Sequence, residues 1–278
     1  MLHFYLAGIN NQNFLMRDKE TGSWWQQITG KAIFGPMRGA SLDTVLSDEL
    51  TFGEWKAEVS DGKVLAPVVK YDKEYDSKWE PEVEKLPVVI SFPGSALKSR
   101  DVVVGLEMDG ASRAYPWESL VKESPVVDHV HGTPLLVVVG PDGKSFRVFV
   151  SRIDGKEAEF FLKGGMETDT GAKPDTPGED KSAEAKSGDA KSNDVKPPSP
   201  VGSKVVSDSS AASGGGPAPS AVNKSWLLLD TTTASEWNFQ GCAVSGPAHG
   251  KCLEQVYALK DYWFDWRNYH PDTSVYKR

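Results

Sequence analysis

Two short clusters of oxygen-bearing side chains, each ending in a tryptophan, are the parts of this chain whose residue types could do chemistry. Their matching members are Asp18, Thr21, Ser23 and Trp25 in the first cluster and Asp230, Thr233, Ser235 and Trp237 in the second. A carboxylate and two hydroxyls beside a flat indole could line a pocket for a sugar or another ring-bearing ligand. The same side chains could instead bond their own backbone as Asx and Ser/Thr turns at a hairpin tip. We favour the turn, because it explains these residues without a ligand.

The two aspartates could also act as a catalytic pair. If the fold brought Asp18 and Asp230 into one pocket, they could serve as acid and base in the manner of a glycosidase. Against this, neither Ser23 nor Ser235 lies in a Gly-x-Ser-x-Gly elbow or has a histidine beside it in the sequence. A paired-aspartate pocket with a raised carboxyl pKa would favour a hydrolase, whereas separate turn tips would favour binding or structure.

Two further pairs of residues alternate along expected strands, so the members of each pair share a face. Arg113 and Tyr115 could clamp a carboxylate ligand, although an ion pair across strands with an aromatic neighbour is the favoured interpretation. His129 and His131 are weak metal candidates, since no third ligand is fixed by spacing. We therefore expect no metal, and no cofactor motif is present.

The chain contains two cysteines, Cys242 and Cys252, both in its C-terminal part. Their spacing matches no thioredoxin-like or zinc-binding pattern. Lys31 and Ser41 stand at the matching positions of the repeat described next, so that unit is expected to fold without cysteine. A structural disulfide is therefore optional; we favour unpaired cysteines over a disulfide or redox pair, and the sequence leaves the oxidation state open.

An internal repeat must position the two clusters. In the first copy, the cluster is followed by a Gly-Pro-x-x-Gly element at 35–39 and by Trp55; in the second copy, the same elements stand at 246–250 and at Trp266. A single gap near Ile28 aligns the two copies, because Asp to Trp spans 37 residues in the first and 36 in the second. Segments with the same residue types at the same offsets should share a local fold.

The repeat also locates an insertion. Residues 165–224 contain no aromatic residue, Leu, Ile or Cys, and such a composition predicts disorder. Before each cluster lie two apolar triplets, at 4–6 and 14–16 in the first copy and at 160–162 and 226–228 in the second. The second copy thus carries about 56 additional residues in one loop, which a fold tolerates because loop-closure entropy grows slowly with length. We predict that Phe160 to Leu162 packs near Trp226 to Leu229.

The remaining patterns predict a mainly β (α+β) protein of antiparallel sheets and meanders with few short helices. Asp109-Gly110 predicts a hairpin, Ser47 a helix N-cap, and residues 79–93 a connector. We divide the chain into a partial first repeat unit (1–70), a connector (71–100), a second repeat unit (101–164 with 225–278) and the disordered insertion (165–224).

Composition narrows the classes of partner. The 278 residues are 39% hydrophobic with a net charge of −8, and no stretch concentrates Lys and Arg, so we expect no nucleic-acid partner. No apolar run approaches the roughly 20 residues of a membrane span, and the first residues lack the pattern of a signal peptide. Nine tryptophans favour a small-molecule or carbohydrate ligand. The oligomeric state stays open.

Several motifs carry a family resemblance: Arg113-Ala114-Tyr115-Pro116, Val126-Val127-Asp128-His129, Val139-Gly140-Pro141, and the repeated motifs from Asp230 to Gly250. With them, the chain resembles the bacterial family of domain of unknown function 3179. The resemblance covers residues 102–278 apart from the insertion, while residues 4–55 resemble the later half of another copy.

The resemblance brings no established activity. The family's cysteine position is Gly140 here, and its usual histidine falls near Ser124, so we expect no Cys/His chemistry in this copy. Relatives that are exported imply a periplasmic or secreted protein whose N-terminus is truncated here. The sequence favours an extracytoplasmic ligand-binding or interaction module without catalysis, with a hydrolase at Asp18 and Asp230 as the alternative and a structural role as the third hypothesis.

Overall fold

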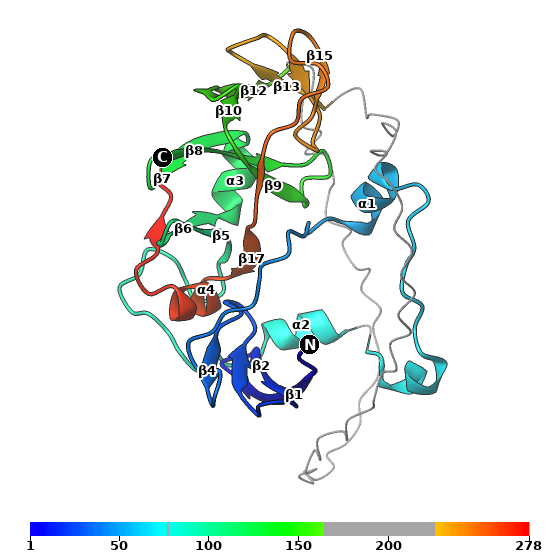
Figure 1. Cartoon of the computed structure of the whole chain (residues 1–278), viewed down its shortest axis with the longest axis vertical. Coiled ribbons are helices and arrows are strands. Elements are labelled where there is room, and N and C mark those ends of the chain that lie inside the picture. The colour runs from blue at the N-terminus through cyan, green and yellow to red at the C-terminus, as the bar shows by residue number, and fades with distance from the viewer. Residues whose placement is uncertain (77, 164–225, 278) are drawn as a thin grey trace, which may run out of the picture. The chain divides into compact units, whose positions relative to one another are not determined.

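The computed structural model describes residues 1–76, 78–163 and 226–277 (Figure 1). The predicted disordered insertion at 165–224 lies outside the described residues. The described chain is mainly β, with several antiparallel sheets and few short helices, as the sequence predicts. No helix among the described residues is long and apolar enough to cross a membrane.

The two copies of the repeat form four-stranded sheets with the same strand order. The first copy contains β1 (Phe4–Asn10), β2 (Asn13–Asp18), β3 (Trp24–Gln26) and β4 (Ala32–Phe34). The second contains β12 (Phe160–Leu162), β13 (Leu228–Asp230), β14 (Glu236–Trp237) and β15 (Ala243–Ser245). Each sheet is antiparallel and follows chain order. Phe160 pairs with Asp230 and Leu162 with Leu228, so the predicted contact of these segments is confirmed.

Two other four-stranded sheets combine strands from between the two repeats with strands that follow the second repeat in the chain. One contains β17 (Leu259–Tyr262), β5 (Val102–Met108), β6 (Ala111–Pro116) and β18 (Ser274–Val275), in that order, with β18 parallel to β6. The other contains β16 (Gln255–Val256), β9 (Phe146–Val150), β8 (Thr133–Val139) and β7 (Val126–Val130). A two-stranded ribbon, β10 (Arg152–Ile153) and β11 (Lys156–Glu157), follows β9. The predicted hairpin joins β5 to β6, with positive φ at Asp109 and Gly110 as a type I′ turn requires.

The helices are short: α1 (Phe52–Glu58), the 3₁₀-helix η1 (Val69–Glu74), α2 (Trp79–Glu84), α3 (Trp117–Glu123) and α4 (Trp263–Tyr269). The predicted N-cap at Ser47 is wrong, because α1 begins after Thr51, whose Oγ1 accepts a bond from the Glu54 amide at 3.2 Å. A tertiary contact explains why Thr51 rather than Ser47 caps the helix, since the Thr51 hydroxyl also donates to Asp142 at 2.6 Å. Within the predicted connector at 79–93, α2 forms.

The core is built around β8, whose two faces are both buried. Leu136 and Val138 pack with Leu228 and Trp237 of the second repeat sheet. The alternate residues of β8, such as Val137, pack against β5, β6 and α3. Full burial of one such side chain contributes about 1.5–3 kcal/mol. This double burial explains why β8 is a continuous apolar run rather than an alternating one.

Candidate functional site

Each repeated aspartate accepts several hydrogen bonds from residues of its own turn. Asp230 Oδ2 accepts bonds from the Trp237 indole at 2.9 Å, the Ser235 amide at 3.0 Å and the Thr233 hydroxyl at 2.7 Å. The first copy has the same arrangement, with Trp25 donating to Asp18 at 2.8 Å. Both aspartates are almost completely buried. The turn interpretation therefore accounts for the polar atoms of the motif.

The serines and glycines of the motif serve the same turn. Ser23 Oγ accepts a bond from the Met37 amide, and Ser235 Oγ accepts one from the Ala248 amide, both at 2.9 Å. These bonds fasten the Gly-Pro-x-x-Gly element to the turn. Gly246 has a φ of 83°, and a Cβ there would lie 2.7 Å from Ser235 Cα. The backbone approach thus requires glycine.

The pKa values of the two aspartates are lowered. Burial alone would raise the pKa of Asp18, but hydrogen bonds from Trp25 and Thr21 outweigh it and lower the pKa to about 2. The pKa of Asp230 is lowered by the corresponding bonds against the same effect of burial. Neither carboxyl group has the raised pKa that a general acid needs.

Arg113 and Tyr115, the candidate clamp for a carboxylate ligand, lie on β6. Arg113 Nε donates to Asp128 Oδ2 of β7 at 2.9 Å, so Asp128 supplies a carboxylate from within the chain. Tyr115 is fully buried, and burial, followed by the charge of Asp128, raises the pKa of its hydroxyl. The ring of Tyr115 lies 5.4 Å from that of Tyr276.

The two histidines do not alternate along one strand. His129 lies on β7 and contacts Glu157 of β11, with 2.9 Å between its Nε2 and Glu157 Oε1. His131 lies beyond the end of β7, in the turn to β8, with a φ of 49°. The expectation of a shared strand face is therefore wrong. Across the described ranges, no three His, Cys, Asp or Glu side chains converge as metal ligands would.

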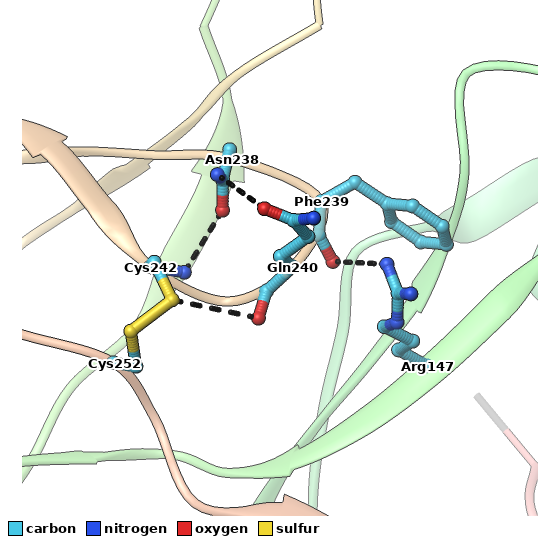
Figure 2. The surroundings of a disulfide bond; sticks show 6 residues. All are labelled: Arg147, Asn238, Phe239, Gln240, Cys242 and Cys252. Atoms are coloured by element: carbon cyan, nitrogen blue, oxygen red, sulfur yellow. Dashed lines mark hydrogen bonds between the residues drawn. A yellow bond between two sulfur atoms is a disulfide. The ribbon is translucent and has the colours of Figure 1, made fainter. Parts of the chain in front are cut away.

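A disulfide joins Cys242 to Cys252 (Figure 2), so the expectation of no disulfide is wrong. The two residues face each other in an isolated antiparallel bridge, as Lys31 and Ser41 do in the first copy. The repeat thus places two backbones side by side at this point whether or not cysteines occupy it. The Asn238 side chain accepts a bond from the Cys242 amide at 2.9 Å and closes the same turn.

Loss of the disulfide should destabilise the second repeat without unfolding it. The bond closes a loop with a sequence separation of 10 residues. Such a loop is worth about 2–3 kcal/mol in the chain-entropy model. We expect the double variant Cys242→Ser/Cys252→Ser to lose this amount in denaturant unfolding. Reductant should have the same effect on the wild type, because Cys252 is exposed, and none on the variant. Equal stability of the two proteins would contradict the prediction.

A cleft that was not predicted from the sequence includes two acids, Asp261 and Asp265, in its lining. We call it the acid cleft; its volume is about 670 Å³. It is lined by Ile9, Gln12, Asn13, Phe14, Gln27, Ile28, Trp79, Val83, Leu86, Tyr257, Leu259, Lys260, Asp261 and Asp265. These residues come from the first repeat sheet, from α2 and the residues just after it, and from the segment that contains β17 and α4. The cleft thus combines apolar walls with a few polar groups, as ligand sites do.

The acid cleft borders the first repeat at positions whose counterparts in the second repeat belong to the hydrophobic core. Phe14 of the first copy corresponds to Trp226 of the second, and Gln27 corresponds to Phe239. Trp226 and Phe239 are each 5% exposed and pack edge to face. Phe14 is 41% exposed, and Gln27 is exposed. One face of the same sheet is therefore closed by packing in one copy and open in the other.

The two acids of the cleft are unusual in their bonding. Asp265 is 6% exposed; its Oδ2 accepts a bond from the Asn13 side chain, and its Oδ1 has no partner. Asp261 Oδ1 accepts the Tyr262 amide at 2.7 Å, and its buried Oδ2 has no partner either. Buried polar atoms are nearly always paired, so each of these oxygens needs an explanation.

Burial raises the pKa of both groups. The pKa of Asp261 rises to about 8 through burial and, next, through the charge of Asp265. The pKa of Asp265 rises to about 6 through burial, against the bond from Asn13. A pair of acids with raised pKa values in a cleft marks a candidate functional site.

A second cavity, of about 420 Å³, includes His270 in its lining. The His270 ring stacks on Trp266 with 3.8 Å between centroids. Its Nδ1 lies 3.1 Å from the Trp266 carbonyl oxygen, and its Nε2 lies 3.5 Å from Glu107. Because both ring nitrogens already face partners, this cavity gives weaker grounds for a ligand than the acid cleft.

A family model described as "Protein of unknown function (DUF3179)" matches residues 6–273. The chain belongs to the DUF3179 family. No curated protein and no solved structure matches it. The match includes both copies of the repeat, so this DUF3179 protein resembles its family beyond the second copy alone.

Packing in this DUF3179 protein fills the position at which the resemblance places a cysteine. A Cβ at Gly140 would lie 2.8 Å from the Phe239 ring, so a cysteine there would require that ring to move. Ser124, near the histidine position, accepts a bond from the Val139 amide at 2.8 Å. The Phe239 ring therefore occupies the space beside Gly140, and Ser124 bonds to the end of β8.

Proposed function

We propose that this protein is a non-catalytic, extracytoplasmic ligand-binding module and that the acid cleft is its binding site. The observation that carries the proposal is the buried Asp265 carboxyl group, which has one oxygen without a partner. Leaving a buried polar atom unpaired costs about 1–3 kcal/mol. A cleft that served stability alone would gain from an apolar side chain at this position. A ligand that donates to this oxygen would offset the cost.

The shape of the cleft supports a small molecule rather than a large partner. Its volume of about 670 Å³ lies within the range of small-molecule sites. Its walls include large apolar side chains that remain exposed, such as Trp79 at 58%. Covering such surface with a ligand is favourable by about 25 cal/mol per Å².

The alternative, a hydrolase that uses Asp18 and Asp230, has less support. The lowered pKa values keep both groups ionised near neutral pH, and their oxygens already accept bonds from their own turns. A general acid or base needs a group that exchanges protons near working pH and faces a substrate. Trp25 and Trp237 are each 1% exposed, so their rings offer little surface to a sugar.

The disulfide supports an extracytoplasmic location. Disulfides persist in secreted and periplasmic proteins and are usually reduced in the cytosol. Cys252 is exposed, so cytosolic reductants could reach this bond.

Filling the acid cleft should abolish binding. We would screen the full chain by ligand-observed NMR against a fragment library of neutral, acidic and basic compounds. Val83 on α2 lines the cleft, whereas Glu82 beside it is exposed and does not. We expect Val83→Trp to weaken the hits at least tenfold and the matched control Glu82→Trp to leave them unchanged. Hits that survive Val83→Trp, or a library without hits, would overturn the proposed function.

A further inference from the structure

The acid cleft has an excess of negative charge that its own lining does not neutralise. Among the described residues that line it, Lys260 is the one cationic side chain. Its ammonium lies 3.5 Å from the centroid of the Trp117 ring and donates to the Lys144 carbonyl at 3.2 Å. Lys260 and Asp261 are neighbours on β17, and neighbours on a strand point to opposite faces. The Lys260 ammonium therefore interacts on the opposite face of β17 and does not neutralise the two acids.

Among the described residues, no hydrogen bond or ion pair joins either acid to a cationic side chain. Arg100 donates to Gln12 and to the Leu86 carbonyl, which line the cleft, and its guanidinium lies over the Tyr262 and Phe264 rings instead. Asn13 of β2 donates to Asp265, and the Tyr262 amide donates to Asp261. The charge of Glu49 acts on Asp261 and, like that of Asp265, raises its pKa. The Tyr269 hydroxyl, whose pKa is raised chiefly by burial, is neutral at ordinary pH.

The walls of the cleft suit the same kind of ligand. Phe14, Trp79 and Tyr257 are 41%, 58% and 38% exposed and lie on its lining. Exposed aromatic faces attract ammonium groups as well as apolar surface. An ammonium group has three donors, and the unpaired oxygens of Asp261 and Asp265 are acceptors without a donor.

We propose that the acid cleft binds an organic cation: a primary ammonium group, held by Asp261 and Asp265, on an apolar body of about the size of an aromatic ring. This inference rests on the proposed function, because it names the chemical class of ligand for the same site. The ammonium pairs with the two carboxylates in a buried setting, where charge-assisted hydrogen bonds are strong. The apolar body covers the aromatic walls.

Binding should release protons, and affinity should rise with pH. In the empty cleft, the raised pKa values keep the two carboxyl groups partly protonated near pH 7. The ammonium favours their ionised forms and therefore displaces protons. Because ionisation proceeds from about pH 5 to pH 8, affinity for an amine should increase at least tenfold across this interval.

The test compares three probes of one shape on the full chain: 2-phenylethylamine, the neutral 2-phenylethanol and the anionic 3-phenylpropanoate. Isothermal titration at pH 7 in two buffers of different ionisation enthalpy measures both affinity and proton release. We expect the amine to bind at least tenfold more tightly than the alcohol, with proton release, and the acid not to bind. Asp265→Asn, which keeps an oxygen for the Asn13 bond, should weaken the amine at least tenfold, whereas the exposed control Asp272→Asn should not.

The outcomes separate this inference from the proposed function. If the alcohol or the acid binds as tightly as the amine, and Val83→Trp still abolishes binding, the cation inference fails and the binding site stands. If the amine binds without loss in Asp265→Asn and Asp261→Asn, the inference fails as well. If none of the probes binds, the inference fails, and the fragment screen then decides the proposed function. Thermal melts of both Asn variants verify folding.

Discussion

Asp230→Ala should be among the most destabilising single substitutions in this protein, although Asp230 lies outside the proposed site. The variant leaves the Ser235 amide and the Trp237 indole without an acceptor, and both residues are almost completely buried. Each such donor costs about 1–3 kcal/mol, so we expect a loss of about 4 kcal/mol. In a domain of this size, the loss lowers Tm by roughly 10 °C. Denaturant unfolding and thermal melts measure it.

The effect should depend on pH with a definite sign. The pKa of Asp230 is lowered in the folded protein, so its carboxylate stabilises the fold above the ordinary aspartate value of 3.8. This contribution is lost as pH falls through the folded value. The stability difference between wild type and Asp230→Ala should therefore shrink below about pH 4.

Two control measurements test whether Asp230→Ala affects stability specifically and leaves ligand binding intact. Asp272→Ala, at an exposed position, should melt like the wild type. The affinity of Asp230→Ala for cleft ligands, measured below its Tm, should be unchanged. A variant that melts normally but loses ligand would instead restore the repeated motif as a binding site.

The repeat made the strand order predictable from the sequence. Residues of the same type at the same offset occupy the same register, as Phe4 opposite Asp18 and Phe160 opposite Asp230 show. This is why the contact across the predicted insertion could be stated in advance. The turn role of the Asp-x-x-Thr-x-Ser motif followed from the local bonding of short oxygen side chains.

The acid cleft could not be predicted in the same way. Asp261 and Asp265 are spaced by four residues among aromatics, a signal that also fits an exposed helix face. Their partner Asn13 is distant in sequence, with a separation of 252 residues from Asp265. Burial that depends on such contacts has no signature in one sequence. The choice of Thr51 over Ser47 as N-cap depended on a distant residue too, Asp142.

The disulfide was missed for a different reason. The repeat correctly equated Cys242 and Cys252 with Lys31 and Ser41, and the first copy can form its bridge without cysteine. From this we inferred that the cysteines had no need to pair. The inference overlooked that an antiparallel bridge brings opposed side chains within reach of each other, whatever their type.

Arg147→Met should release the segment that contains α1 from the second repeat unit. Arg147 is 4% exposed on β9 and donates to Asp48 at 3.0 and 2.7 Å and to Glu58 at 2.7 and 2.8 Å. Its guanidinium also donates to the Phe239 carbonyl at 3.4 Å (Figure 2). Burial would lower the pKa of Arg147, but the bonds to Glu58 and Asp48 outweigh it and raise the pKa, so the charge is permanent.

Removing one partner of a buried ion-pair network is strongly destabilising, because the other charges stay behind. Since Asp48 and Glu58 are themselves partly exposed and can be hydrated, we expect a loss of about 3 kcal/mol rather than more. Hydrogen exchange should accelerate in residues 48–58 and stay unchanged in β13, which lies outside the network. Unchanged exchange in that segment would show that apolar contacts hold α1 without the arginine.

Arg147→Lys separates charge from geometry. Lysine keeps the positive charge but cannot donate to two carboxylates through a planar fork. If the fork matters, Arg147→Lys should lose most of the stability that Arg147→Met loses. If charge alone matters, it should behave like the wild type. The first result is expected, because all three guanidinium nitrogens donate to carboxylates and Nη1 also donates to a carbonyl, more bonds than one ammonium can make in that place.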